Sequence, residues 1–206
     1  LFPYTTLFRS WRNRFTTENN GFACGLWTFK RWNGPTTGWT TVQLLDQFNQ
    51  PLGADTIEFY ALELLVDPVH PNRWIGVAAG QRWGSSGGGH GDSGSVFFGS
   101  FAVGGDNTWK EVFRTDVSGH SYEDPWDLEF AVNPAALGSS VGYLCVGTGS
   151  ADGAIFRTTN SGQTWNPTPE LTGASTLYGI GVVDADHAVA AGYAGEIWVR
   201  DASGWT

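Results

Sequence analysis

The second half of the chain repeats itself at an interval of 42 to 43 residues. FRTTNSGQTW at 156–165 matches FRTDVSGHSY at 113–122 at five of ten positions, and the final pairs Thr-Trp and Ser-Tyr are similar. A weaker third copy, WVRDASGW at 198–205, places its Ser-Gly pair 42 residues after the Ser-Gly of the preceding copy. An interval of this length indicates one repeated supersecondary unit whose neighbouring copies stack to bury a shared core.

The segments around these copies predict four short antiparallel strands in each unit. LEFAVNP at 128–134 echoes LELLVDP at 62–68, and each precedes a second strand that ends in small residues, YLCVGTG at 143–149 and WIGVAAG at 74–80. A third strand, a tight turn and a fourth strand led by Trp complete the unit. No segment has the pattern of a helix. Four strands repeated every 40 to 45 residues predict an all-β fold, the β-propeller.

We expect a propeller fragment of about 3.5 four-stranded blades, at approximately 11–45, 58–114, 126–168 and 177–206. The second blade can be divided in two ways. Its tight turn is AVGGDNTW at 102–109, which we favour because NTWKEV matches QTWNPT, or TDVSGHSY at 115–122, which keeps the 43-residue interval better. A fragment exposes inter-blade faces, so we expect residues 11–206 alone to be unstable.

TTNSGQTW at 158–165 resembles the Asp-box, or BNR, signature Ser/Thr-x-Asp-x-Gly-x-Thr-Trp, with Asn160 in place of the Asp. In this motif Thr158 closes the third strand, and the Asn160 side chain can accept hydrogen bonds from N–H groups of the turn. Gly162 supplies a positive φ, Thr164 is the Thr of the signature, and Trp165 packs against the neighbouring strand and blade. These roles are structural, so the motif predicts a fold and not a chemistry.

The repeats therefore resemble those of BNR/Asp-box β-propellers, within the WD40/YVTN/BNR-like repeat superfamily. Proteins with such repeats include sialidases, xyloglucan-cleaving glycoside hydrolases, sortilin-like receptors and photosystem II assembly/stability factors. The tail DHAVAAGYAGEIWVRDASGW at 186–205 is most similar to the last group and its non-photosynthetic relatives. Sialidases carry a Phe/Tyr-Arg-Ile-Pro element that this chain lacks.

Two loops hold the densest cluster of reactive side chains in the sequence. In a propeller, the loops between strands two and three and those between blades open on one face, which here includes 80–94 and 113–126. We predict that this face holds a ligand, and the candidates are Arg82, Trp83, His90, Asp92, His120, Tyr122 and Trp126. The alternative is that both loops are solvated turns. Glu123 and Asp124 are the candidate catalytic carboxylates by loop position alone.

The resemblance implies a non-catalytic scaffold outside the cytoplasm that recognises a protein or glycan partner through this face. The alternative is a secreted glycoside hydrolase, which requires two carboxylates with perturbed pKa at catalytic separation. A third hypothesis, a structural surface-array protein, predicts no pocket.

Composition excludes several partners. The formal net charge is −9, so phosphate backbones and anionic lipid heads are repelled, and no apolar run approaches the roughly 18 residues of a membrane helix. His90, His120 and Asp92 lack the short spacing of a metal site, and we expect no metal and no cofactor. GDSGS at 91–95 resembles a trypsin-like nucleophile segment, but no matching His segment lies upstream. We expect the two cysteines to be buried free thiols rather than a disulfide.

The first ten residues, LFPYTTLFRS, have neither a signal-peptide pattern nor a helical one. Their codons can be written as a sequencing adapter, CTC TTT CCC TAC ACG ACG CTC TTC CGA TCT. We expect residues 1–10 to be a fused library artefact and leave them out of the fold prediction. The alternative is an ordinary N-terminus.

Overall fold

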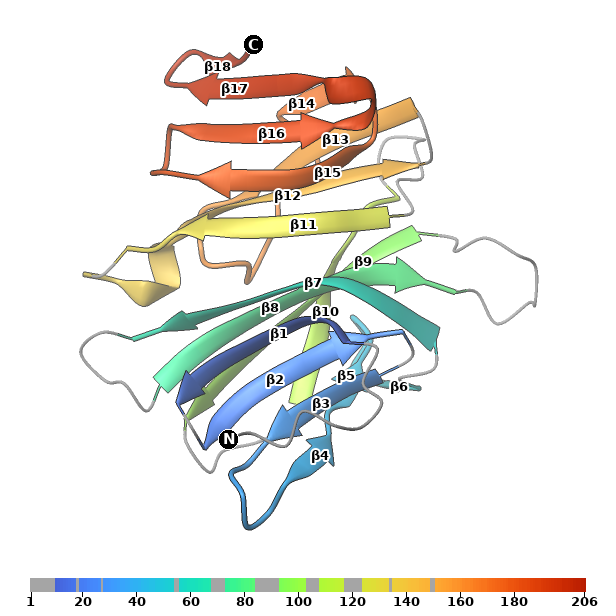
Figure 1. Ribbon diagram of the computed structural model, residues 1–206, viewed down its shortest axis with the longest axis vertical. Coiled ribbons are helices and arrows are strands. Elements are labelled where there is room, and N and C mark those ends of the chain that lie inside the picture. Colours follow the sequence, from blue (N-terminus) through green and yellow to red (C-terminus); the bar gives the residue numbers. More distant parts are fainter. Residues whose placement is uncertain are drawn as a thin grey trace.

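The computed structural model describes residues 10–17, 19–26, 28–53, 56–67, 73–83, 93–102, 108–116, 124–133, 135–148 and 151–206. These residues form four sheets, which we call blades 1 to 4 in chain order. In each blade four consecutive strands pair antiparallel with their neighbours in the sequence. Figure 1 shows the blades following one another, with blade 1 (blue) at one end of the molecule and blade 4 (red) at the other.

The strands of each blade are as follows. Blade 1 has β1 (Ser10–Thr17), β2 (Asn20–Gly25), β3 (Thr28–Trp32) and β4 (Trp39–Thr41). Blade 2 has β7 (Ile57–Val66), β8 (Arg73–Arg82), β9 (Ser93–Ala102) and β10 (Thr108–Arg114). Blade 3 has β11 (Asp124–Ala131), β12 (Val141–Thr148), β13 (Ala151–Thr158) and β14 (Leu171–Ala174). Blade 4 has β15 (Leu177–Val182), β16 (Ala188–Gly192), β17 (Ile197–Asp201) and β18 (Gly204–Trp205).

Two details of the blades concern points of the sequence expectation. Residues 10–17 form the inner strand β1, so blade 1 has four strands, and four blades are present where about 3.5 were expected. β9 and β10 pair with each other, so the third and fourth strands of blade 2 lie on either side of 103–107, as in the division of this blade that the sequence favoured. The 3-10 turns of the described residues include η2 (Leu137–Ser139) and η3 (Tyr193–Gly195).

The first strands of successive blades, β1, β7, β11 and β15, lie side by side, and the sheets stack through their faces. Three apolar clusters fill the junctions, one between each pair of neighbouring blades. A tryptophan in or just before the fourth strand of a blade packs against the preceding blade. Trp109 lies 5.3 Å from Phe22, and Trp205 lies 5.9 Å from Tyr143, measured between ring centroids.

The Asp-box turn shows how this junction is built between blades 2 and 3. The Thr164 N–H donates to Asn160 Oδ1 over 3.0 Å, and the Gly162 N–H donates to Thr158 Oγ1 over 3.1 Å. Gly162 has a φ of 82°. Trp165, which follows the turn, stacks on Phe113 of blade 2 with ring centroids 6.3 Å apart. Asn160, which stands at the Asp position of the signature, therefore accepts a backbone N–H of the turn through its side chain, as the motif predicts.

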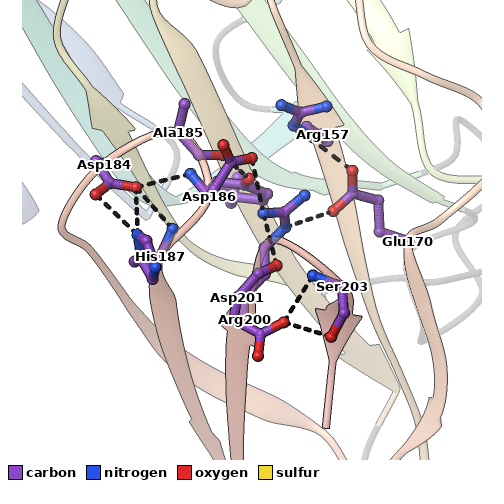
Figure 2. A network of polar contacts seen from close by, with 10 residues as sticks. Arg157, Glu170, Asp184, Ala185, Asp186, His187, Arg200, Asp201 and Ser203 are labelled. Carbon is purple, nitrogen blue, oxygen red and sulfur yellow. Dashed lines mark hydrogen bonds and ion pairs between the residues drawn. The ribbon is translucent and has the colours of Figure 1, made fainter.

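Figure 2 shows a polar network at the junction of blades 3 and 4. Arg200 of β17 is buried and donates to Glu170 over 3.1 Å and to Asp186 over 3.3 Å. Its guanidinium lies 5.4 Å from the ring centroid of Tyr143, whose hydroxyl donates to the Ala185 carbonyl over 2.6 Å. Blade 3 is thus tied to the turn between β15 and β16 and to the third strand of blade 4.

Blade 2 is extended beyond its fourth strand. β5 (Gln43–Leu45) pairs parallel with β10, and β6 (Pro51–Leu52) pairs antiparallel with β5. Gln43–Leu45 thus pair with blade 2, although they directly follow the last strand of blade 1 in the sequence. This hairpin covers the outer edge of blade 2, which would otherwise expose unpaired backbone groups.

The fourth strand of blade 3 starts later than its leading Trp165 suggested. Backbone N–H groups of Asn166 and Glu170 already donate to β13, yet regular pairing begins only at Leu171. Pro167 and Pro169 lie between them and have no N–H for a ladder.

Cys24 and Cys145 are buried free thiols, which confirms that expectation. In the described part of the chain, no helix is long and apolar enough to span a membrane.

Candidate ligand-binding face

The inner strand of every blade carries an extra residue at the same register position. In blade 2, Phe59 pairs with Gly80 and Ala61 with Ala79, so Tyr60 is unmatched on β8. The same count of two residues against one leaves Trp126 unmatched on β11, Tyr178 on β15 and Trp11 on β1. A β-bulge of this kind re-aims one side chain out of the regular alternation. All four bulged residues are aromatic.

Three of these aromatic side chains form a continuous row across blades 2, 3 and 4. The Tyr60 and Trp126 rings lie 4.9 Å apart at 31°, and the Trp126 and Tyr178 rings lie 5.3 Å apart in an edge-to-face arrangement. Tyr60 and Trp126 are half-buried, whereas Tyr178 is 46% exposed. The row lies near the start of the inner strands, at the face where the connections between second and third strands and between blades open. We call it the aromatic row.

Charged side chains continue the row into blade 1. Arg12 follows the bulge of β1 and donates through Nε to the Tyr60 carbonyl over 3.2 Å and through Nη2 to Asp127 Oδ1 over 3.1 Å. Asp127 occupies the corresponding position in blade 3, and its Oδ2 accepts the Ile180 N–H of blade 4 over 3.2 Å. Blade 2 has the small Ala61 at this position. The Arg12–Asp127 pair therefore joins blades 1 and 3 past blade 2, and Asp127 also holds blade 4.

A second layer of charges lies two residues further along the inner strands. Arg14 donates to Glu63 Oε1 through Nε over 3.0 Å and also through Nη2. Glu129 has the position of Glu63 on the next blade, paired opposite Tyr143 as Glu63 is opposite Val77. These contacts give the inner strands a mixed-charge layer beside the aromatic row.

Burial raises the pKa of two carboxyl groups in this region. Burial raises the pKa of Asp127, and the Ile180 N–H and the Arg12 guanidinium partly offset the rise. Burial together with the neighbouring Glu63 and Asp127 carboxylates raises the pKa of Glu129. Burial and the carboxylates of Asp124 and Glu58 raise the pKa of the Tyr60 phenol, so this hydroxyl stays protonated.

The structure gives Arg82 a partner within its own blade. Its Nη1 lies 3.2 Å from each oxygen of Glu111, whose side chain is buried. Ser95 and Arg114 also donate to Glu111, over 2.6 and 3.3 Å. Arg82 thus belongs to a network across β8, β9 and β10.

The other candidates from the sequence divide into described and undescribed residues. Trp83 is half-buried directly after β8, where its backbone N–H donates to the Thr56 carbonyl over 2.8 Å. Asp124 begins β11, is half-buried and lies close enough to Tyr60 to raise its pKa. Trp126 is the centre of the aromatic row. His90, Asp92, His120, Tyr122 and Glu123 lie outside the described residues.

Sequence reasoning missed Arg12, Tyr60, Asp127 and Tyr178. The sequence does carry a signal for two aromatic residues of the row. Tyr60 lies two residues before the Leu-Glu pair of LELLVDP, and Trp126 lies two residues before the Leu-Glu pair of LEFAVNP. Such a face can stack an apolar or sugar ring on the aromatic row and donate to an acceptor from Arg12. Among the described residues, no group of three or more His, Cys, Asp or Glu side chains is arranged to hold a metal ion.

Comparisons with known proteins agree with this architecture. No family model matches the sequence, and no curated protein does. YCF48 from Cyanidioschyzon merolae has a similar fold, with a TM-score of 0.52 and 14% identity over 93% of this chain and 50% of that chain. The GH74 xyloglucanase from Xanthomonas campestris gives a TM-score of 0.52 and 18% identity over 94% of this chain and 29% of that chain. This chain therefore spans half the length of the first structure and less than a third of the second. Its fold is that of a partial β-propeller, of which the described residues form four blades.

Proposed function

We propose that this chain is part of a non-catalytic binding or assembly scaffold that works outside the cytoplasm. Its loop-bearing face recognises a protein or glycan partner, and the aromatic row is the centre of that contact. The observation that carries the proposal is the ring-to-ring contact that joins Tyr60, Trp126 and Tyr178 from three successive blades. Rigid aromatic side chains with one polar tip lose little conformational entropy on binding and are enriched at binding hot spots.

The carboxylates of Asp127 and Glu63 beside the aromatic row already have partners within the protein, which supports a binding function over a catalytic one. Both oxygens of Asp127 already accept hydrogen bonds, from Arg12 and from the Ile180 N–H. Glu63 is paired with Arg14. Asp127 and Glu129 are two residues apart on one strand and so lie on the same side of the sheet. A glycosidase instead places its two carboxyl groups on either side of the scissile bond.

One observation favours the alternative of a glycoside hydrolase. The raised pKa of Asp127 and of Glu129 is the kind of shift that a general acid requires. The two functions separate in one experiment, because a scaffold binds its ligand without changing it.

The test uses three panels: xyloglucan oligosaccharides, sialyllactose and a displayed peptide library. Tryptophan fluorescence and calorimetry measure binding, and reducing-end release measures hydrolysis. We expect binding in one panel, no hydrolysis, and a loss of about tenfold or more in affinity for Tyr178→Ala. Phe48→Ala is the matched control, because Phe48 is an exposed aromatic residue in the turn between β5 and β6, away from the row.

Two results would contradict the proposal. Release of reducing ends that disappears in Asp127→Asn or Glu129→Gln would assign the face to a hydrolase. Equal affinities of Tyr178→Ala and Phe48→Ala would remove the aromatic row from the contact.

A further inference from the structure

The residue that stands two positions before the bulged aromatic residue is acidic in blades 2 and 3. It is Glu58, before Tyr60, in blade 2, and Asp124, before Trp126, in blade 3. Both residues pair with the second strand of their blade, so they occupy equivalent register positions on neighbouring inner strands. Because the inner strands start at the loop-bearing face, both carboxylates lie on the side of the aromatic row from which a ligand approaches.

The two carboxylates lie close to the Tyr60 side chain. The Tyr60 hydroxyl donates to Gln81 Oε1 over 3.2 Å, and Gln81 pairs opposite Glu58 in the ladder. Burial raises the pKa of the Tyr60 phenol, and the Asp124 and Glu58 carboxylates raise it further. One carboxylate comes from the strand of Tyr60 itself and the other from the next blade. The tyrosine end of the aromatic row is therefore acidic.

The protein supplies no counter-ion for Glu58 in the part of the chain that the structure describes. No arginine, lysine or histidine there forms an ion pair with this carboxylate. Arg12 and Arg82 lie beside this junction, but Arg12 pairs with Asp127 and Arg82 with Glu111. Glu58 is half-buried, so its charge stays accessible to a cation that comes from outside the chain.

Aromatic rings next to a carboxylate attract a cation in two ways. The face of a Trp or Tyr ring carries a negative electrostatic potential, and the carboxylate adds a full charge. A guanidinium group uses both, because it is planar and stacks on a ring while its N–H groups donate to a carboxylate. Tyr178, at the other end of the row, is 46% exposed and offers further ring surface to the chain that carries the cation.

We propose that the acidic end of the aromatic row binds an arginine side chain of a partner protein. This inference rests on the proposed function and selects its protein alternative over the glycan. The guanidinium lies between the Glu58 carboxylate and the rings of Tyr60 and Trp126, and the partner's backbone continues along the row to Tyr178. The net charge of −9 attracts a basic partner over longer distances as well.

The same carboxylates act against the glycan alternative. Most sugar rings are neutral, so they gain nothing from the charge of Glu58 and Asp124. An acidic sugar such as sialic acid would be repelled by both.

The test compares two peptides on the full chain. One is an N-acetylated, C-amidated heptapeptide with arginine at its centre between glycine and serine residues. The other carries citrulline there, which has nearly the same shape and no charge. Tryptophan fluorescence measures both affinities. We expect the arginine peptide to bind about tenfold more tightly or better, and the difference to shrink at about 0.5 M salt.

Variants of the chain assign this preference to the acidic end of the row. Glu58→Gln keeps the shape of the side chain and should lower the affinity for the arginine peptide about three- to tenfold, with no change for the citrulline peptide. Asp46→Asn is the matched control, because it removes a carboxylate in the turn between β5 and β6, away from the row. Its amide oxygen can still accept the N–H groups of Phe48 and Gln50. If Glu58→Gln fails to fold, Asp124→Asn tests the second carboxylate of the same end.

The results separate this inference from the proposed function. Equal affinities for the two peptides would overturn the arginine site, and so would an arginine preference that Glu58→Gln and Asp46→Asn reduce equally. A glycan that binds at the row in place of the arginine peptide would overturn the arginine site and leave the scaffold standing. The proposed function itself fails only when no ligand of any class distinguishes Tyr178→Ala from Phe48→Ala.

Discussion

Replacing Gly162 by alanine tests how closely blades 2 and 3 approach each other. A Cβ at this position would lie 2.6 Å from Val77 Cγ2 of blade 2, and the residue has a φ of 82°. Two costs therefore add. The left-handed backbone conformation costs an L-residue about 1–2 kcal/mol, and forcing a methyl group into a packed core costs about 1–3 kcal/mol. We expect a loss of about 2–5 kcal/mol in the free energy of unfolding.

Gly173→Ala is the matched control. Gly173 has a φ of 76°, but an added Cβ there meets nothing within 4 Å. This variant should therefore lose only the backbone part, about 1–2 kcal/mol. The difference between the two variants, measured by urea unfolding with the slope held constant, isolates the crowding between the blades.

A double variant makes the reasoning sharper. Val77→Ala removes both Cγ atoms that crowd the site, so Gly162→Ala should cost at least about 1 kcal/mol less in that background than alone. Losses for Gly162→Ala and Gly173→Ala that agree within about 0.5 kcal/mol would refute the close approach. So would strict additivity with Val77→Ala.

Three further predictions follow from the buried polar groups. Because burial raises the pKa of Asp127, the folded state holds its proton more tightly than the unfolded state does. The contribution of this group is therefore most favourable below about pH 4 and is lost as the pH rises through the raised pKa. The free energy of unfolding, measured with urea, should therefore fall between pH 4 and 7 in the unchanged chain relative to Asp127→Asn. A difference between the two proteins that does not change with pH would contradict the raised pKa. Burial also raises the pKa of Cys24 and Cys145, so neither thiol should react with a disulfide reagent until the chain unfolds. Rapid labelling of the native chain would contradict their burial. Glu111→Ala should destabilise the chain by about 3–5 kcal/mol, because it leaves two arginines without their buried carboxylate. A loss below about 1 kcal/mol would show that Arg82 does not depend on this pair and restore it as a ligand candidate.

The repeat allowed the blades to be predicted because its signals are local. Asn160, Gly162 and Trp165 act within one turn and one junction, so their spacing alone indicates the turn that the structure contains. The β-bulges could not be predicted in the same way. A bulge breaks the alternation of a strand by one residue, and a bulged aromatic such as Trp126 looks in the sequence like any strand residue.

The candidate site was harder to predict because its contacts join distant segments. Arg82 stands beside a predicted loop and suggested a ligand contact, but its partner Glu111 lies 29 residues away across β9. Arg12 and Asp127 are 115 residues apart, and only the stacking of the blades brings them together. Trp126 was predicted to face the ligand and lies at the centre of the aromatic row. The assignment of His90, Asp92, His120, Tyr122 and Glu123 to the same face stays a prediction.

The parallel pairing of β5 with β10 sets an order in which the chain can fold. Thr108 pairs with Gln43, so 65 residues separate the partners, whereas the hairpins within each blade close over short connections. Contacts between distant segments form slowly because the chain loses more entropy before they are made. During synthesis, residues 43–52 emerge before any strand of blade 2 exists. They must wait, with their own hairpin as the only available pairing, until β10 has been made. The outer edge of blade 2 is therefore sealed late, and until then it is the part of this propeller most open to pairing with the wrong strand.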